Sequence, residues 1–466
     1  MKKILLIGVV VVAGVVVATP KYASSRFESQ LTSTIEKINQ TPGYQASIIS
    51  NEIGWFDAKT TIHINLDFAS LPQYANQPLP ADLPEIATDL TFNTQFGPLL
   101  FADNALFGLY STSAEIAAEP LREHLTWPQN QPFAKVTLSE SLTHSFYMHD
   151  ELTAFSFDDD SGRLKLEFSG YQGNGSWVGK KLAYEGNAAS FSSEGEFDSN
   201  LKGIKLSVSA ATDLASVLAG ELYESSTTFS IDGFESKPLQ ISDMLFTAAS
   251  TLDKTKDTSS LQMRYQVGKV HAKDVELSNA ALAMNVKDID NGFIRELQQM
   301  IEEASKADQD PQIMQLKLIG FIQEKLPELL QKSPVLDMQL TAEIPQGKFD
   351  AKLDSQIDDI TAPIKLQQLD DEAFWLEHAK AHLNANMDKD VANFIAAMTL
   401  KYRLASSPQF ARMSPTEQQQ MLDTQAGTVL EQLIKTNILQ QKDDQFVVEA
   451  SVEKGVAKLN GMPIPL

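Results

Sequence analysis

The sequence predicts an α+β protein: an N-terminal transmembrane helix, then a β-rich, mostly antiparallel body, with helices concentrated in the C-terminal part. Three observations predict it. An unbroken apolar run follows two lysines at the start, the middle of the chain alternates apolar and polar residues, and helical spacing dominates after residue 290. We therefore divide the chain into a membrane anchor (1–22), a juxtamembrane helix (23–43), a β-rich region (44–289) and an α+β region (290–466).

Composition and charge narrow the classes of function. The chain has 466 residues, of which 43% are hydrophobic and 21% charged, as in ordinary globular proteins. Its net charge of −23 repels phosphate backbones, so we expect no nucleic-acid partner. The absence of cysteine excludes disulfides, thiolate zinc sites, cysteine nucleophiles and a lipoprotein attachment residue.

Residues 4–18 form the apolar run, behind Lys2 and Lys3. At about 1.5 Å per residue the run covers roughly 22–24 Å of a ~30 Å hydrocarbon core, and Tyr22 suits the interface beyond it. A cleaved signal peptide is the alternative, but Val16-Val17-Ala18 only partly matches a cleavage site, so an uncleaved anchor is favoured. The lysines place the N-terminus in the cytoplasm and the body on the opposite side. The predicted anchor residues are Ile4, Leu5, Leu6, Ile7, Val9, Val10, Val11, Val12, Val15, Val16 and Val17.

The next segment, residues 24–40, has apolar residues at Phe27, Leu31, Ile35 and Ile38. This spacing predicts an amphipathic helix.

The long middle of the chain alternates with the period of a strand, clearly so in residues 61–68 and 163–168. Such alternation is typical of antiparallel sheet with one face buried. Residues 155–157 and 164–168 flank an acidic turn and predict a hairpin. Further strands are predicted at 204–208, 227–231, 261–267 and 275–284, and the proline-rich residues 71–84 predict a loop.

After residue 290 the pattern changes. Helices are predicted at 293–305, 311–330, 391–400 and 416–435, and strands at 336–344, 348–357, 381–387, 446–451 and 456–459. Asn285 precedes Phe293 by the same interval that separates Asn386 from Phe394, each where a strand gives way to a helix. Either a duplicated strand–helix unit or chance explains this match.

Histidines and carboxylates suggest metal ligands only superficially. His378 and His382 would share one face of a helix, but the apolar residues at 381, 383, 385 and 387 place His382 on a strand. His144, His149 and Asp150 belong to another alternating segment, so solvent-facing histidines are favoured there too. We therefore predict no metal site.

No catalytic signature is present. Asp158, Asp160 and Gly162 match the first positions of a calcium-binding loop. The glutamate that would complete the loop is missing, because a predicted strand follows directly. Gly179-Lys180-Lys181 lacks the hydroxyl of a phosphate loop. We predict no catalytic residue and no cofactor, and we expect the protein not to be an enzyme; a hydrolase built from scattered residues is the remaining alternative.

Two aromatic turns remain. Gly54-Trp55-Phe56 lies between predicted strands, and Phe96-Gly97-Pro98-Leu99 repeats the pattern. Core packing beneath the turns is the favoured role for their large side chains, and an exposed contact with a partner or with lipid is the alternative.

The lysine-led anchor, the short helix and these two turns resemble the YdgA-like family of Gram-negative envelope proteins, as does the C-terminal stretch from Gly455 to Pro463. That family often has a histidine before Gly-Pro, where this chain has Phe96, so no role is carried over for that imidazole. The resemblance implies a bacterial inner-membrane protein with its body in the periplasm, self-association, and no established activity. Gly54, Trp55, Phe56, Gly97 and Pro98 are the candidate contact residues.

Two hypotheses for function follow. The first is a non-enzymatic envelope scaffold or adaptor that acts through protein contacts, as a homodimer or with another envelope protein. The alternative is binding or transfer of lipid, or of another hydrophobic ligand, along an apolar groove of the sheet, as AsmA-like envelope proteins are thought to do. In both, the N-terminal helix holds the protein in the lipid bilayer.

Overall fold

The computed structural model describes residues 2–40, 43–66, 86–102, 105–159, 163–195, 198–213, 216, 221–273, 275–306, 311–358, 360, 368, 371–405 and 407–464. Within helices α1, α3 and α4, the side chains of residues 2–18, 301–306 and 311–315 lie outside this description. The predicted loop at 71–84 also lies outside it.

The chain divides into two compact units. Unit 1 comprises Met1–Phe229 and Arg295–Phe321, and unit 2 comprises Ser230–Ile294 and Ile322–Leu466. The division falls within β15 (Ser225–Ser236), α3 (Asn291–Lys306) and α4 (Pro311–Leu330).

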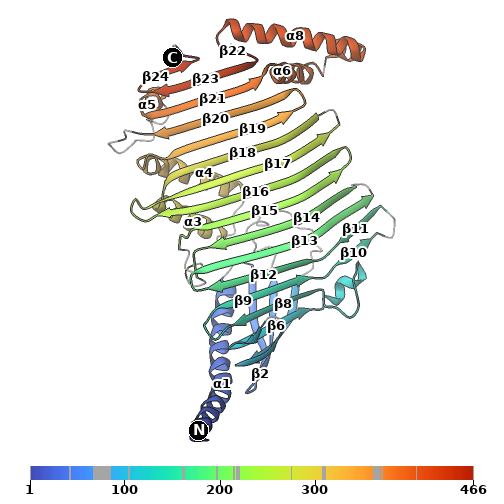
Figure 1. Ribbon diagram of the computed structural model, residues 1–466, viewed down its shortest axis with the longest axis vertical. Helices are drawn as coiled ribbons and strands as arrows, with labels where there is room; N and C mark the ends of the chain where they lie inside the picture. The colour runs from blue at the N-terminus through green and yellow to red at the C-terminus, as the bar shows by residue number, and fades with distance from the viewer. Residues whose placement is uncertain are drawn as a thin grey trace. The chain divides into compact units, whose positions relative to one another are not determined.

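Unit 1 is built on an antiparallel sheet in which β1, β2, β3, β6, β8, β9, β12, β13 and β14 pair in that order (Figure 1). The far half of β13 also pairs with β11, which is followed by β10 and β7. A separate small hairpin joins β4 and β5. The bounds are β1 (Tyr44–Ile53), β2 (Asp57–Leu66), β3 (Ile86–Phe96), β4 (Leu99–Ala102), β5 (Ala105–Phe107), β6 (Tyr110–Ile116), the 3-10 helix η2 (Glu119–Glu123), β7 (Leu125–Thr126), β8 (Ala134–Glu140), β9 (Phe146–Leu152), β10 (Phe155–Asp158), β11 (Leu164–Phe168), β12 (Tyr171–Val178), β13 (Lys181–Gly195) and β14 (Ser199–Ala210).

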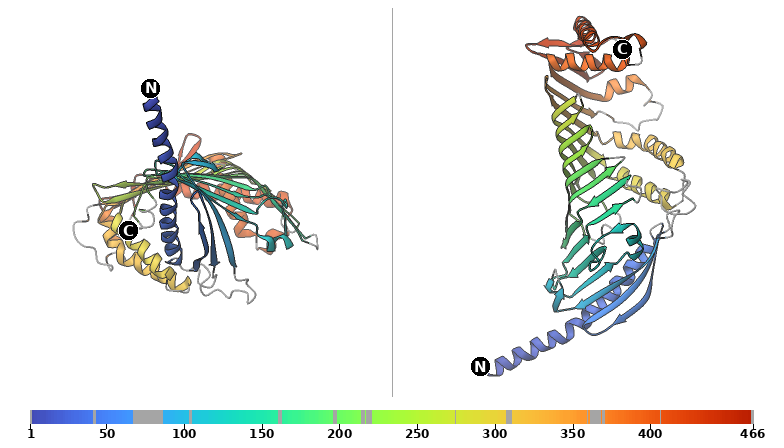
Figure 2. Two further views of the ribbon diagram at one scale, coloured as in Figure 1. Left: turned by 90° about the horizontal axis from the view of Figure 1, so that it is seen from below. Right: turned by 90° about the vertical axis from the view of Figure 1, so that its right-hand side faces the viewer.

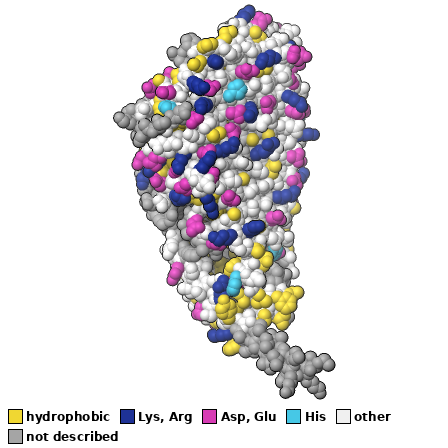
Figure 3. Space-filling view, turned by 60° about the vertical axis from the view of Figure 1, so that its left-hand side comes forward, with side chains coloured by type: hydrophobic (Ala, Val, Ile, Leu, Met, Phe, Trp, Pro, Cys, Tyr) yellow, Lys and Arg dark blue, Asp and Glu magenta, His cyan; other side chains and the backbone are white. Residues whose placement is uncertain are grey.

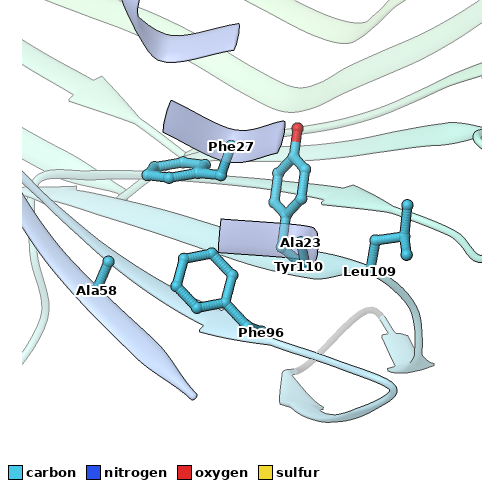
Figure 4. Packing of buried hydrophobic residues seen from close by; sticks show 6 residues of the cluster. All are labelled: Ala23, Phe27, Ala58, Phe96, Leu109 and Tyr110. Carbon is cyan, nitrogen blue, oxygen red and sulfur yellow. The ribbon is translucent and has the colours of Figure 1, made fainter. Parts of the chain in front are cut away.

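A single helix, α1 (Lys2–Gln40), contains both the predicted anchor and the predicted amphipathic segment, and lies against one face of the first strands of unit 1 (Figure 2). Ala23 and Phe27 are buried there with Phe96 and Tyr110, as Figure 4 shows. The Phe27 ring packs edge-on, with its centroid 5.8 Å from that of Phe96 and 5.5 Å from that of Tyr110. The prediction that Phe27 and Leu31 lie on the apolar side of the helix is thus confirmed.

Polar contacts fix the same helix to the sheet. Arg26 Nε donates to both carboxylate oxygens of Glu140, at 2.8 and 3.0 Å, and the Glu140 side chain is fully buried at the end of β8. His144 Nδ1 lies 2.8 Å from the same carboxylate. The Tyr110 hydroxyl donates to Gln30 Oε1 at 2.7 Å, and burial, together with the charge of Glu140, raises the pKa of Tyr110.

In unit 2 the strands are also antiparallel, and β16, β17, β18, β19, β20, β21, β23, β24 and β25 pair in that order, with β22 also beside β23. The strand bounds are β16 (Leu239–Asp253), β17 (Thr258–Ala272), β18 (Val275–Asp290), β19 (Val335–Ile344), β20 (Gly347–Ile357), β21 (Ala379–Asp388), β22 (Gln440–Lys442), β23 (Gln445–Glu453), β24 (Val456–Leu459) and β25 (Met462–Pro463).

Helices cover one end of this sheet. They are α5 (Glu372–His378), α6 (Lys389–Leu404), α7 (Pro408–Ala411) and α8 (Pro415–Lys435), with α6 and α8 lying side by side (Figure 1). Ala392 of α6 and Leu430 of α8 are buried with Phe446 of β23. The helix α8 begins at a capping box, in which Ser414 and Glu417 satisfy each other's backbone N–H groups. The Ser414 hydroxyl and backbone N–H both donate to the Glu417 carboxylate and lower its pKa.

The α+β class and the predicted strands and helices in the described ranges are therefore confirmed, including the hairpins of β10 with β11 and of β19 with β20. Both Asn285 and Asn386 lie on strands that lead directly into helices, α3 and α6. Among the helices, as far as their residues are described, none is long and apolar enough to cross a membrane. The predicted anchor residues fall where side chains lie outside the description, and the anchor stays a prediction.

The ion pair of α1 gives a test of how the helix is held. We expect Arg26→Gln to lower the free energy of unfolding by about 3 kcal/mol, because it leaves a buried carboxylate with His144 as its remaining described partner. Glu140→Gln should cost less, about 1–2 kcal/mol, because the Arg26 side chain is 33% exposed and regains water. Urea denaturation followed by tryptophan emission measures both.

The control is Glu119→Gln, which breaks the pair between Arg122 and the exposed Glu119 and should cost less than about 0.5 kcal/mol. Equal costs for Arg26→Gln and Glu119→Gln would contradict a stabilising buried ion pair between Arg26 and Glu140.

Candidate functional site: an apolar sheet face

One face of the sheet in unit 2 is apolar across seven neighbouring strands. We call it the apolar face and define it by three rows of side chains that stand opposite one another in register. The rows are Phe246, Tyr265, Leu282, Leu340, Ala351, Ala385 and Val448; Ala248, Met263, Met284, Met338, Leu353, Leu383 and Ala450; and Ser250, Leu261, Val286, Leu336, Ser355, Ala381 and Val452. Because side chains alternate along a strand, one register places all of them on the same side.

The opposite face carries the polar residues that lie between these rows. Arg264, Gln339 and Lys352 belong to one polar row, and Asp337 and Asp354 to the next. Cross-strand ion pairs run along this face, such as Lys287 Nζ to Asp337 Oδ2 at 2.8 Å. This is the composition of a face that water covers.

The exposure of the apolar face shows that it is incompletely covered. Where α6 and α8 pack on it, Phe446 is only 6% exposed, but Tyr265 is 47% and Leu340 42% exposed. Within the described strands β16 to β21, no apolar side chain of the three rows is fully buried. Neighbours on one sheet face shield one another in part, so these intermediate values indicate that the described side chains leave the face partly open.

The size of this face is the reason to regard it as a site. Its rows run across six inter-strand spacings of about 4.8 Å and along about 14 Å of each strand, which gives on the order of 400 Å². The largest contiguous apolar patch on a soluble monomer is typically about 300–600 Å² and is often functional, so the apolar face has the size of such a patch.

Methionine occupies the centre of the middle row. Met263, Met284 and Met338 stand side by side on β17, β18 and β19. The unbranched thioether side chain adapts its shape to whatever it contacts, and methionine is frequent on surfaces that take ligands of variable shape. The centre of the apolar face is thus suited to a flexible apolar ligand and has no charged group of its own.

The aromatic turns lie in unit 1. The Phe96 N–H donates to Phe56 O at 2.7 Å, so the two turns are neighbours. A side chain at Gly97 would place Cβ 1.7 Å from the carbonyl oxygen of Gly108, which explains why glycine stands there. Phe96 is buried as expected, but the favoured core role is wrong for Trp55, Phe56 and Leu99, which are 49–57% exposed, because Phe27 of α1 packs on Phe96 and not on them. The adjacent Pro98 is half-buried and its carbonyl accepts from Gly108 N–H.

A polar cluster in unit 1 surrounds Asp150. The Tyr184 hydroxyl donates to Asp150 Oδ2 at 3.1 Å and also contacts the Tyr171 hydroxyl. The paired Gly173 and Gly186 leave room for it, because a Cβ at either would collide with these rings. Burial and the hydrogen bonds raise the pKa of Tyr184, so the cluster positions a carboxylate without supplying a nucleophile.

The candidate histidines are not brought together. His149 lies on the opposite side of β9 from Asp150 and contacts Glu151 and Asn174. His378 ends α5 and His382 lies on β21, so the strand prediction for His382 is confirmed. Among the described residues, no group of three or more histidine, aspartate or glutamate side chains has a geometry that could hold a metal ion.

Unit 1 also has a polar cleft of about 690 Å³ on the sheet surface away from α1. Lys59, Asn93, Ser113 and Thr137 stand in one register row there, with Glu52 nearby. The cleft carries charges of both signs, so its electrostatics select no class of ligand.

Sequence reasoning missed Glu140, and it proposed an apolar groove of the sheet without identifying the residues that form the apolar face. Glu140 ends an ordinary alternating strand, and nothing local distinguishes a buried carboxylate from an exposed one. The rows of the apolar face were visible strand by strand, in residues 261–267, 275–284 and 336–344, but their alignment requires the register between strands.

Comparison with protein families identifies one match. The model of a family described as a bacterial protein of unknown function (DUF945) matches residues 1–466, the whole chain. Comparisons with curated proteins and with solved structures find no match. The match agrees with the expectation of an uncharacterised bacterial family, and the YdgA-like name stays a prediction.

The openness of the apolar face can be measured by adding charge to it. We expect Met284→Asp to lower the free energy of unfolding by only about 1–2 kcal/mol, because the carboxylate can reach water. Leu430→Asp, in the core between α6 and α8, should cost more than about 4 kcal/mol. Ala283→Asp, one residue along on the polar face, serves as the matched control. If Met284→Asp were as costly as Leu430→Asp, the face would be a closed core.

The contact of His149 with Glu151 predicts a small pH dependence. The hydrogen bond that His149 Nε2 donates to the Glu151 carboxylate is the main reason that the pKa of His149 is raised. A raised pKa means that the pair stabilises the fold fully below the unfolded pKa of about 6.5 and loses this contribution as pH rises through the folded pKa. We expect His149→Gln to lower stability by about 0.2–1 kcal/mol at pH 5.5 and by nothing measurable at pH 8.5. Urea denaturation at the two pH values tests this, and an equal loss at both would contradict it.

Proposed function

Since the chain belongs to the bacterial family of unknown function DUF945, we propose that it is a membrane-tethered protein of the bacterial envelope whose apolar face binds the acyl chains of lipids. The observation that carries the proposal is the incomplete cover of the apolar face: its members Tyr265 and Leu340 are both more than 40% exposed. Water against such a surface is unfavourable, so a ligand that covers it gains free energy by burial, at about 25 cal/mol for each Å².

The tether is the apolar segment at residues 4–18 of α1. Lys2 and Lys3 support a cytoplasmic N-terminus, and the resemblance to the YdgA-like family supports the bacterial inner membrane with the body in the periplasm. A protein held at a bilayer has a lipid source within reach at all times. Tethering therefore raises the effective concentration of the ligand that the apolar face is suited to bind.

Two features favour acyl chains over a folded protein as the ligand. The three rows contain no charged side chain and few hydroxyl groups, whereas protein interfaces combine an apolar centre with directed hydrogen bonds. The central methionines adapt to chains that differ in length and unsaturation. Neither feature requires catalytic chemistry, so we retain a non-enzymatic role.

A scaffold or adaptor role through protein contacts is the second candidate. An exposed apolar face is also the kind of surface that a partner protein, or a second copy of this chain in a homodimer, can cover. The two candidates differ in what touches Leu340 in the cell.

Site-specific photocrosslinking distinguishes them. We expect p-benzoyl-phenylalanine in place of Leu340 to crosslink to phospholipid in cells labelled with radioactive phosphate, giving a labelled band at the mass of the protein. The same residue at Gln339, which lies on the polar face of the same strand, is the matched control and should give no lipid adduct.

The other outcomes decide against lipid binding. A protein-sized adduct at Leu340, with no lipid adduct, would establish the scaffold or homodimer role instead. No adduct at Leu340, or equal lipid labelling at Leu340 and Gln339, would show that the apolar face takes no specific lipid.

A further inference from the structure

Four turns meet at one end of the sheet of unit 1. Backbone hydrogen bonds connect them in series: Phe96 N–H to Phe56 O, Gly97 N–H to Leu109 O, and Leu109 N–H to Glu140 O, each at 2.7 Å. These bonds link the β1–β2 turn, the β3–β4 turn, the β5–β6 turn and the end of β8, where the β8–β9 turn begins. The turns therefore form one continuous edge of the unit.

This edge exposes large apolar side chains. Leu106 is 68%, Phe107 64% and Phe56 57% exposed, values far above those of the apolar face in unit 2. Figure 3 shows hydrophobic side chains gathered at the lower end of the view, where unit 1 lies, while Lys, Arg, Asp and Glu are spread over the rest of that surface. We call this set the apolar rim; its members are Trp55, Phe56, Leu99, Leu106, Phe107 and Leu142.

The helix α1 is fixed at the apolar rim. Ala23 and Phe27 are buried against residues of these same turns, among them Phe96 and Leu109, and Arg26 is paired with Glu140 at the end of β8. Pro20 is fully buried as well, whereas Tyr22 is exposed. From Ala23 back to the end of the apolar run at Ala18 is five residues of helix, about 7.5 Å along its axis.

This spacing relates the rim to a bilayer. If residues 4–18 lie in hydrocarbon, the membrane surface falls within about 10 Å of the rim, the depth at which interfacial side chains are embedded. Tryptophan, phenylalanine and leucine are the residues found on protein surfaces that are embedded at that level. The rim consists of these three residue types.

We propose that the apolar rim inserts into the interface of the same bilayer that holds α1, in the leaflet that faces the body of the protein. The proposal rests on the tether of the proposed function and adds a second attachment to it. A single helix leaves the attached unit free to tilt, whereas a helix and a row of embedded turns define its orientation. Unit 1 then stands on the membrane with its strands pointing away from it.

Spin labels measure the depth of single residues. The chain has no cysteine, so one substitution at a time can be labelled in the full-length protein. We choose Leu106→Cys in the rim and Leu121→Cys in η2, which follows the opposite end of β6 and is also exposed. Val12→Cys reports on the tether. The protein is reconstituted in phosphatidylethanolamine and phosphatidylglycerol vesicles, and collision with oxygen, which concentrates in lipid, is compared with collision with a water-soluble nickel chelate.

We expect the ratio of oxygen to nickel accessibility at Leu106 to be several-fold higher than at Leu121 and to approach that at Val12. A rim label as accessible to nickel as Leu121, with Val12 in lipid, would overturn the proposal and leave the tether intact. Nickel accessibility at both Val12 and Leu106 would overturn the tether as well. Spin–spin broadening at Leu106, absent after dilution with unlabelled protein, would show that a second copy covers the rim, which also overturns insertion.

Discussion

The structure depends on one constraint: in each unit the antiparallel strands have an apolar and a polar face, and the described helices cover only part of the apolar side. Strand alternation and register place leucine, methionine and phenylalanine together on one surface of unit 2, while lysine and aspartate ladders solvate the other. In unit 2 the helices α6 and α8 close one end of that surface. What they leave open, among the described residues, is an apolar surface on which Tyr265 and Leu340 are more than 40% exposed, and the proposed function follows from it.

The same constraint operates in unit 1, where α1 covers part of the apolar side. There the cover is strengthened by a buried ion pair, and the geometry is specific because Glu140 is fully buried and accepts hydrogen bonds from Arg26 on two oxygens. A helix held in this way has a fixed direction where it leaves the sheet. The direction of α1 at residues 20–27 therefore decides where the preceding apolar run must lie relative to the turns around it.

The apolar rim of unit 1 and the apolar face of unit 2 are two different kinds of surface. The apolar rim consists of side chains from turns and from the β4–β5 hairpin that are 49–68% exposed, as suits insertion into an interface. The apolar face consists of side chains that stand in register on the sheet and partly shield one another from water. Together they form a broad surface that suits a ligand laid along the strands. A chain with a net charge of −23 is not attracted to anionic headgroups by its overall field, so the proposed membrane attachment relies on burial of apolar side chains.

By itself the sequence determined the local structure. The spacing of Phe27 and Leu31 predicted the buried side of α1, alternation predicted the strands of both units, and the periods at 311–330 and 416–435 predicted α4 and α8 nearly to the residue, because each signal comes from neighbours along the chain. Only the tertiary structure decided that Met263, Met284 and Met338 stand side by side, that Glu140 is buried beside Arg26, and that Trp55 and Phe56 face outward. Those facts depend on register between strands and on the place where a helix packs, and neither is encoded by the period of any single segment.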